Sequence, residues 1–483
     1  MNKIIKNYIY TITYQLLNIV LPLITTPYIS RVLGAEKIGV FSYTYSIVQY
    51  FTLISMLGIA DHGNRSIAMV RSSQSQKTET FWNIYIIQFI SSLVAVFIYI
   101  LYLVHSTSKY KEIAILQIFY LAASLLDINW YFWGNEKFKL TVSRNIIIKL
   151  AAVLAIFLFV KNEKDLTVYV LINAGSILIS NLLLWIFLLQ DIKFITINRQ
   201  KIIQNIKPVL ILFIPLVARS VFVFMDKIML GNMSSMEQVG FYENAEKLIL
   251  APTAILTSLG TVMLPRISLL NKSGESEQSS RLTQMSIQYV LFAGFAFTFG
   301  MAGIAPVLVP LFLGNEFTAS IDLVALMSVT IILVGWTNVI RTQYLIPNGK
   351  DKPYMWSVVF GALINFVINY FSIPYLGAKG AVYGWIAAEV LITIYQTVAA
   401  YKGLPIKKYL ADVIPYLVAG IVMFCGIRLI TAKISKSVIW LFAEIFIGAL
   451  IYFAVILFFF HNKIRGLLRE KRAKGVRLHN ENK

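Results

Sequence analysis

Cysteine, histidine and nucleotide-binding motifs are scarce or missing in this sequence of 483 residues. The single cysteine, Cys425, lies in an apolar segment where we expect a small core residue, and one cysteine cannot form an intramolecular disulfide. The four histidines fall at predicted loops or ends, which argues against a buried histidine relay or metal site. The sequence has no Gly-x-x-x-x-Gly-Lys-Ser/Thr loop to bind ATP phosphates. We therefore expect no catalytic residues, no metal and no cofactor.

Charged residues are also few, at 14% of the chain, whereas 58% of the residues are hydrophobic and the mean hydropathy is +0.71. Soluble domains do not have this composition. A helix that crosses a membrane needs about 20 mainly apolar residues, and such stretches recur from Tyr8 to Phe460. The breaks between them are too short for an independent domain. We therefore predict an all-α integral membrane protein.

Fourteen apolar segments are predicted to cross the membrane. Helices are favoured because membrane strands would show alternation over about ten residues instead of long apolar runs. The predicted spans are residues 8–30, 38–60, 81–104, 113–133, 144–160, 166–189, 208–230, 239–262, 286–311, 319–346, 354–374, 380–401, 412–430 and 438–460.

Basic residues distinguish the two sides of the membrane. With the N-terminus inside, the cytoplasmic segments and the tail hold 28 lysines and arginines, against about 9 in or beside the outer loops. Cytoplasmic loops are enriched in these residues, so we predict that both termini are cytoplasmic. The net charge of +20 then reflects topology and not a nucleic-acid partner. We interpret the basic tail, residues 461–483, as a membrane anchor, with binding to anionic lipids or a partner as the alternative.

An internal repeat divides the chain. Residues 33–43 and 230–242 both place Leu-Gly at the end of one helix and a glycine with aromatic residues at the start of the next. The copies are six spans apart, so they are parallel and related by a pseudo-two-fold axis along the membrane normal, with the substrate site between the lobes. Pro22, Pro27 and Pro215 would let the first and seventh spans bend as the lobes rock, although a purely structural kink is an equal alternative. The predicted parts are an N-terminal six-helix lobe at 1–207, a C-terminal six-helix lobe at 208–411, a terminal helix pair at 412–460 and the tail.

Ionisable residues inside membrane spans are costly, and each is a candidate functional residue. The strongest cluster begins in the span 208–230. Arg219 and Asp226 are two α-helical turns apart and should share a face, whereas Lys227 should point about 100° away from Asp226.

The next span continues this cluster, because Glu243, Glu246 and Lys247 are spaced to share one face. We interpret the cluster as part of a hydrophilic cavity for an anionic substrate; the alternative is local pairing that only holds two helices together. Arg31, at the end of its span, has snorkelling towards head groups as its alternative. The candidate cavity cations are Arg31, Arg219, Lys227, Lys247 and Arg341, and the candidate ion-coupling carboxylates are Asp226, Glu243 and Glu246. Weaker candidates are Asp127, Lys149, Glu389 and a structural pair of Arg428 with Glu444.

Several motifs along the chain identify a family resemblance. They are Arg31-Val32-Leu33-Gly34, Gly58-Ile59-Ala60-Asp61-His62-Gly63-Asn64-Arg65, Trp133-Gly134-Asn135-Glu136-Lys137-Phe138, Asp226-Lys227-Ile228-Met229-Leu230-Gly231, Val239-Gly240-Phe241-Tyr242-Glu243-Asn244-Ala245-Glu246-Lys247, Leu264-Pro265-Arg266-Ile267 and Ile346-Pro347-Asn348-Gly349-Lys350-Asp351-Lys352. The chain resembles the Wzx-type polysaccharide repeat-unit flippases of the multidrug/oligosaccharidyl-lipid/polysaccharide exporter superfamily. The block from Asp226 to Lys247 is the most specific part.

The resemblance implies a flippase that moves undecaprenyl-pyrophosphate-linked oligosaccharide from the inner to the outer leaflet of a bacterial plasma membrane, for capsule, O-antigen or exopolysaccharide assembly. It also implies alternating access with proton or sodium antiport, and a polysaccharide polymerase and a chain-length regulator as candidate partners. The rivals are a flippase for another lipid-linked cell-wall precursor, a drug exporter of the same superfamily, a membrane-embedded polymerase or ligase, and a scaffold for an assembly complex. Polymerases and ligases generally carry a large outer loop, which this sequence lacks.

Overall fold

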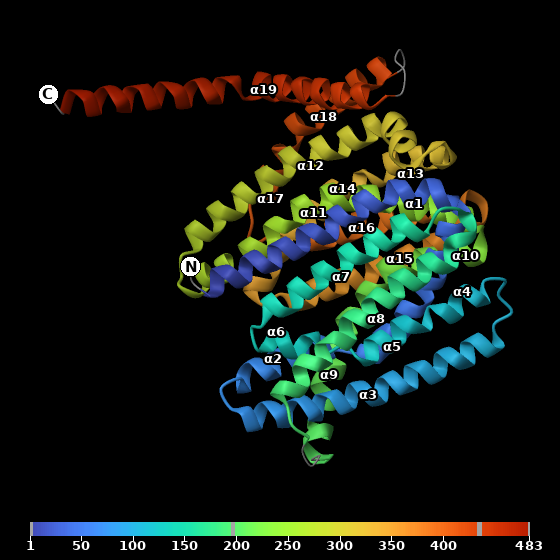
Figure 1. Cartoon of the computed structure of the whole chain (residues 1–483). Coiled ribbons are helices and arrows are strands. Elements are labelled where there is room, and N and C mark those ends of the chain that lie inside the picture. The colour runs from blue at the N-terminus through green and yellow to red at the C-terminus, as the bar shows by residue number, and fades with distance from the viewer. Residues whose placement is uncertain (1–2, 195–198, 432–436, 482–483) are drawn as a thin grey trace. The chain divides into compact units, whose positions relative to one another are not determined.

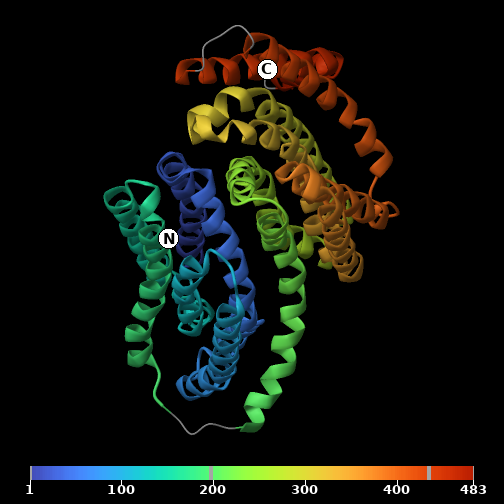
Figure 2. The same ribbon diagram turned by 90° about the vertical axis from the view of Figure 1, so that its right-hand side faces the viewer.

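A computed structural model of the chain describes residues 3–194, 199–431 and 437–481, shown from two sides in Figures 1 and 2. Side chains are described except for those of residues 3–12, 14–16, 19, 218, 431 and 462–481, so the basic side chains of the predicted tail lie outside the described residues. The described backbone is helical with short connections and contains no strand, as the composition predicts. The helices are α1 (Lys3–Met56), α2 (Ile59–Val70), α3 (Gln74–His105), α4 (Lys111–Leu116), α5 (Ile118–Leu125), α6 (Asn129–Gly134), α7 (Phe138–Phe159), α8 (Leu166–Asp191), α9 (Arg199–Ser220), α10 (Asp226–Met233), α11 (Met236–Lys272), α12 (Ser276–Leu313), α13 (Ser320–Met327), α14 (Val329–Ile340), α15 (Asp351–Leu376), α16 (Ala378–Ala400), α17 (Ile406–Ala411), α18 (Val413–Thr431) and α19 (Val438–Glu481).

Twelve stretches within these described residues are long and apolar enough to cross a membrane. They match the third to the fourteenth predicted spans one by one. The chain is therefore an all-helical, multi-pass membrane protein; the count of fourteen spans stays a prediction. The twelve stretches are Gln74–His105, Lys111–Gly134, Phe138–Phe159, Glu163–Asp191, Arg199–Val217, Met236–Lys272, Ser276–Leu313, Asn315–Asn348, Asp351–Leu376, Ala378–Ala400, Ile406–Ile430 and Val438–His461.

The first two predicted spans lie in one element, α1, whose backbone breaks at Gly34 with φ 72° and ψ 175°. The sequence predicts that a helix ends at Leu33-Gly34 and that a short polar turn follows, but the chain is helical on both sides of this glycine. A positive φ has no steric cost for glycine, so one residue changes the direction of the chain without a loop. Pro22 and Pro27 lie inside α1 before the break.

Other predicted spans are interrupted or contain irregular turns. Residues 113–133 form three short helices, α4, α5 and α6, instead of one. Two helices contain a π-helical turn: η2 (Val221–Met225) separates α9 from α10, and η4 (Arg341–Leu345) follows α14. Such turns are rare and are often found at functional sites. Hydropathy alone does not reveal them because the apolar run continues through each.

The chain forms two compact units, one of residues 1–247 with 361–385 and the other of residues 248–360 with 386–483. The predicted lobe boundaries and their symmetry stay predictions. In the first unit, α1 packs against α3, α5 and α7, and α8 packs beside α5 and α7 (Figure 1). Its aromatic core includes the Trp130 ring, which stacks 5.4 Å from the Phe81 ring while the indole Nε1 donates to Gln88 Oε1 at 3.0 Å.

In the second unit, α12 packs along α18 and α19. The Tyr452 hydroxyl of α19 donates to the backbone carbonyl of Phe292 at 2.8 Å. Cys425 is exposed on α18, which corrects its expected core position; a thiol of this size is also compatible with hydrocarbon. Arg428 lies over the Phe424 ring at 5.4 Å, and its pairing with Glu444 stays a prediction.

Many large apolar side chains are exposed on the outer faces of both units. Phe97 is 62% exposed on α3, Leu154 63% on α7 and Phe458 80% on α19. Soluble proteins rarely expose contiguous surfaces of this kind, whereas lipid tails solvate them. We expect these faces to meet the hydrocarbon.

Candidate functional site

A cluster of buried charges joins α10 to α11. Lys227 Nζ lies 2.7 Å from Glu243 Oε2 and 2.8 Å from Glu246 Oε2, so one ammonium group pairs with two carboxylates. Lys247 Nζ lies 3.0 Å from Glu243 Oε1, one helical turn away, which is the favourable Glu-to-Lys order. The predicted shared face of the α11 residues is present, and Lys227 turns towards it.

Neutral hydrogen-bond donors complete the coordination of the carboxylates. The Ser42 hydroxyl of α1 donates to Glu243 Oε2 at 2.8 Å. Asp226, which is 2% exposed, accepts from the Tyr242 hydroxyl and from Asn369 Nδ2 of α15, each at 2.6 Å. Two lysines therefore face three carboxylates, and in this structure Lys227 and Lys247 are already paired with carboxylates. We name Asp226, Lys227, Glu243, Glu246 and Lys247 the charged cluster.

Arg219 is not part of the charged cluster. Its side chain is exposed near the end of α9, and within the described residues no carboxylate lies at salt-bridge distance from it. Asp226 is buried whereas Arg219 is exposed, and the π-helical turn Val221–Met225, which departs from α-helical geometry, lies between them. The predicted shared face of the two residues stays a prediction.

The other two predicted cations lie elsewhere. Arg31 is exposed on α1, where its Nη1 donates to the Pro27 carbonyl at 2.8 Å. Arg341 belongs to the second unit, where it opens the π-helical turn η4 and its guanidinium lies 5.5 Å from the centre of the Tyr354 ring. Of the eight predicted site residues, the structure brings together the five of the charged cluster.

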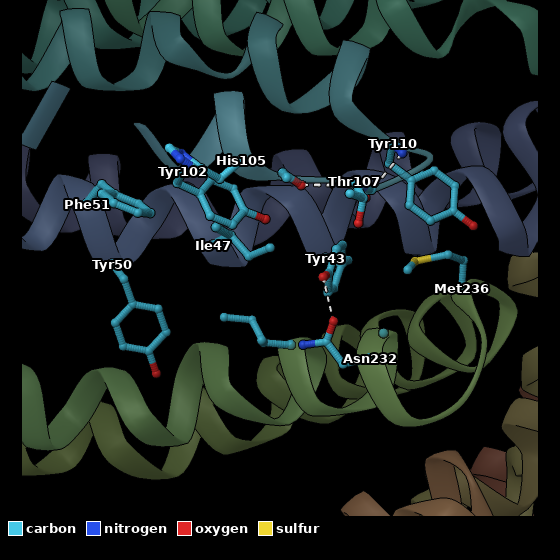
Figure 3. Close-up of a pocket in the computed structure, with 14 residues that line it drawn as sticks. Tyr43, Ile47, Tyr50, Phe51, Tyr102, His105, Thr107, Tyr110, Asn232 and Met236 are labelled. Carbon is cyan, nitrogen blue, oxygen red and sulfur yellow. Dashed lines mark hydrogen bonds between the residues drawn. The ribbon is translucent and has the colours of Figure 1, made fainter. Parts of the chain in front are cut away.

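A cavity of about 680 Å³ opens beside the charged cluster in the first unit. It is formed by α1, the end of α3 with the loop that follows, α10 and the first residue of α11 (Figure 3). No Asp, Glu, Lys or Arg lines it, so its wall is formally neutral. We name it the aromatic cavity; it is lined by Tyr43, Ile47, Tyr50, Phe51, Tyr102, His105, Ser106, Thr107, Ser108, Tyr110, Ile228, Gly231, Asn232 and Met236.

Neighbouring residues on α1 and α10 separate the two sites. Ser42 binds Glu243 of the charged cluster, whereas Tyr43 lines the aromatic cavity. Across from Tyr43, the Asn232 Oδ1 accepts the Tyr43 hydroxyl at 2.7 Å, and Figure 3 shows the two side chains meeting between the helices. The same helix pair thus presents a charged face and a neutral face.

The two copies of the internal repeat meet through their glycines. A Cβ on Gly39 would lie 1.7 Å from the Met236 carbonyl oxygen, and a Cβ on Gly240 would lie 2.0 Å from the Ala35 carbonyl oxygen. Each glycine therefore lets the opposite backbone approach more closely than any side chain allows. Because Gly39 and Gly240 occupy matching places in the repeat, the contact is reciprocal.

Sequence reasoning missed the neutral partners and the aromatic cavity. Asn369 and Ser42 reach the carboxylates from segments far away in the chain, and no local pattern signals such a contact. A weak signal existed for the cavity, since Tyr43, Ile47 and Tyr50 recur at helical spacing on α1. That pattern is more often a packing stripe, so it carried no prediction.

Comparison with known proteins identifies the family. The sequence pattern of the family described as "Polysaccharide biosynthesis protein" matches residues 4–271, more than half of the chain. The chain belongs to this family.

Two bacterial relatives described as O-antigen transporters support the assignment. One, from Shigella dysenteriae, is 26% identical over 384 residues, which cover 78% of this chain and 95% of the relative. The other, from Escherichia coli (strain K12), is 23% identical over 399 residues, which cover 80% and 94%. The predicted family resemblance is confirmed.

Two solved structures show the same fold at low sequence identity. The lipid II flippase MurJ, in an inward closed conformation, has a TM-score of 0.68 at 14% identity, covering 92% of this chain and 99% of MurJ. An inward-facing multidrug resistance transporter of the MATE family has a TM-score of 0.56 at 13% identity, covering 82% of this chain and 98% of its own. The prediction of a membrane transporter and not an enzyme is confirmed by these comparisons.

Proposed function

We propose that this protein is a flippase that carries an undecaprenyl-pyrophosphate-linked oligosaccharide from the inner to the outer leaflet of a bacterial plasma membrane by alternating access. Membership of a polysaccharide biosynthesis family and the two relatives described as O-antigen transporters support the cargo. The observation that carries the proposal is the charged cluster itself. Five ionisable groups within spanning helices are costly, and a diphosphate crossing the bilayer needs such cations.

Exchange of ion-pair partners is the proposed mechanism. The cargo diphosphate competes with Glu243 and Glu246 for Lys227 and Lys247. A buried carboxylate that loses its partner is strongly destabilised, so the released carboxylates take up a proton or sodium ion and return it in the opposite direction. The proposed coupling groups are Asp226, Glu243 and Glu246, and Arg31, Arg219 and Arg341 are proposed as further cations along the pathway.

The proposed topology has fourteen spans with both termini in the cytoplasm. The two halves of α1, on either side of Gly34, supply the spans that precede the other twelve. The reciprocal contact of Gly39 and Gly240 supports two six-helix lobes, residues 1–207 and 208–411, related by a pseudo-two-fold axis. The terminal pair and the basic tail follow, and a polysaccharide polymerase and a chain-length regulator are the proposed protein partners.

Replacement of the cations tests this function. Arg219→Ala, Lys227→Ala and Lys247→Ala should each impair the appearance of lipid-linked oligosaccharide in the outer leaflet while the protein still inserts in the membrane. Lys207→Ala is the matched control, because Lys207 is exposed near the start of α9. If all three variants transport at the wild-type rate, the proposal that these cations bind the cargo is wrong.

The coupling proposal needs a separate measurement. In proteoliposomes that contain the purified protein, an imposed proton or sodium gradient should accelerate flipping of the lipid-linked oligosaccharide. Glu243→Gln and Glu246→Gln should weaken that acceleration. Flipping that is equally fast without any gradient would remove antiport from the proposal and leave the cargo untouched.

A further inference from the structure

The aromatic cavity has the size of a small-molecule site but lacks the charge of a phosphate site. Its volume of about 680 Å³ is within the usual range of roughly 300–1,000 Å³ for ligand pockets. Five aromatic rings line it, those of Tyr43, Tyr50, Phe51, Tyr102 and Tyr110. Hydroxyl and amide groups and the His105 imidazole lie between them, and no Asp, Glu, Lys or Arg takes part. A diphosphate would find no counter-charge there.

Packing alone does not account for these rings. Tyrosines that anchor a helix at the membrane interface point towards the head groups, whereas these come from three segments of the chain and surround one space (Figure 3). The hydroxyl groups of Tyr102 and Tyr110 have no hydrogen-bond partner among the described residues. Both therefore keep a donor and an acceptor for a ligand.

We propose that the aromatic cavity binds a neutral sugar ring of the cargo oligosaccharide. A pyranose ring has an apolar face of C–H groups, which packs on the negative face of an aromatic ring, and an edge of hydroxyl groups. The tyrosine and serine hydroxyls and the Asn232 amide match that edge as donors and acceptors. This inference rests on the proposed function and adds a division of labour: the charged cluster binds the diphosphate, and the aromatic cavity binds sugar.

An organic cation is the main competing ligand, because aromatic cages also bind quaternary ammonium groups. The aromatic cavity has no carboxylate in its wall, and its polar groups include several hydroxyls that such a cation would leave without a partner. The observations therefore favour a sugar over a cation, and the experiment includes both.

Binding of a lipid-free sugar tests the inference. The full-length protein in lipid nanodiscs is titrated with the neutral oligosaccharide released from the lipid-linked precursor of the host strain, and in parallel with tetramethylammonium. Saturation-transfer NMR reports which sugar protons touch the protein, and calorimetry gives the Kd. Tyr102→Ala should raise the Kd for the oligosaccharide about tenfold, because one stacked ring contributes up to about 1.5 kcal/mol.

Three further variants distinguish loss of the ring from loss of the hydroxyl group and from unspecific effects. Tyr102→Phe retains the ring and should raise the Kd less than fivefold. Tyr110→Ala, in the loop before α4, is independent of the packing of Tyr102 against Phe51 and should raise the Kd about tenfold. Tyr375→Ala is the matched control, since Tyr375 is 88% exposed on α15, and it should leave the Kd unchanged.

The outcomes separate this inference from the proposed function. Oligosaccharide binding that is lost in Tyr102→Ala and Tyr110→Ala supports the sugar site. Binding that both variants retain, or binding of tetramethylammonium alone, overturns it. Binding of the intact lipid-linked oligosaccharide without any binding of the free sugar also overturns the sugar site and leaves the proposed function standing. If neither the free nor the lipid-linked oligosaccharide binds, both proposals fail.

Discussion

The charged cluster and the aromatic cavity lie on two faces of the same helix pair and satisfy their polar groups in opposite ways. In the charged cluster, each carboxylate is held by a lysine or by neutral donors within about 3 Å, because an unpaired buried charge is severely destabilising. In the aromatic cavity, no Asp, Glu, Lys or Arg lines the wall, and the hydroxyls of Tyr102 and Tyr110 have no hydrogen-bond partner within the described part of the chain. Neutral polar groups can line a cavity without a bound partner, whereas a buried ionised group must always be paired with an opposite charge or a hydrogen-bond donor.

The largest effect on stability is expected from removing a lysine of the charged cluster. Lys227→Met removes the ammonium group that contacts both Glu243 and Glu246. Two carboxylates then share a buried site with fewer partners, and we expect the unfolding free energy to fall by about 3–5 kcal/mol. Thermal unfolding of the purified protein in detergent measures it.

A rescue variant identifies the cause. Lys227→Met combined with Glu246→Gln removes one uncompensated charge and should recover part of the lost stability. If the double variant is as unstable as Lys227→Met alone, the loss of stability does not come from the unpaired charge. It then comes from the lost packing of the lysine side-chain stem.

A single methyl group added beside the aromatic cavity should reduce both the stability of the protein and the size of the cavity. A Cβ on Gly231 would lie 2.2 Å from Cδ2 of Tyr43, so Gly231→Ala must push that ring into the aromatic cavity. We expect a loss of about 1–3 kcal/mol from overpacking, together with a narrower cavity. Gly175→Ala on α8 is the control, because no atom apart from the neighbouring backbone of its own helix lies within 4 Å of its added Cβ. The stability of this variant should stay the same or rise. Equal effects of the two substitutions would contradict the tight contact at Gly231.

Hydropathy and loop charge were sufficient to predict the class of fold, but they located only part of the site. Twelve spans could be placed because apolar runs of membrane length are unmistakable, and the i,i+4 spacing placed Glu243 beside Lys247. The helix end at Leu33-Gly34 was predicted, but the helix that resumes directly after Gly34 was not. The π-helical turns were also not predicted, since they change the backbone and leave the composition unchanged. The turn Val221–Met225 matters for Arg219, because a face assigned by α-helical geometry shifts across a π-helical turn.

The hydrogen bond between the two helices should contribute a smaller amount. Tyr43→Phe and Asn232→Ala each remove one partner of the 2.7 Å contact across the aromatic cavity. A double-mutant cycle on unfolding free energies should give a coupling of about 0.5–1.5 kcal/mol, the usual range for a neutral hydrogen bond. A coupling near zero would mean that water replaces the bond at no cost.

The smallest stability effect and the most informative one belong to Lys247→Gln. The Lys247 side chain is 30% exposed. When Lys247 is replaced, Glu243 still has Lys227 and Ser42 as partners. The unfolding free energy should therefore fall by less than about 1 kcal/mol. If the charged cluster only holds helices together, flipping should then be nearly normal. If Lys247 binds the diphosphate, flipping of the lipid-linked oligosaccharide should fall at least tenfold in a protein of nearly wild-type stability. Measured side by side on one preparation, the two quantities separate a structural ion pair from a transport site, because only the second makes function fall far more than stability.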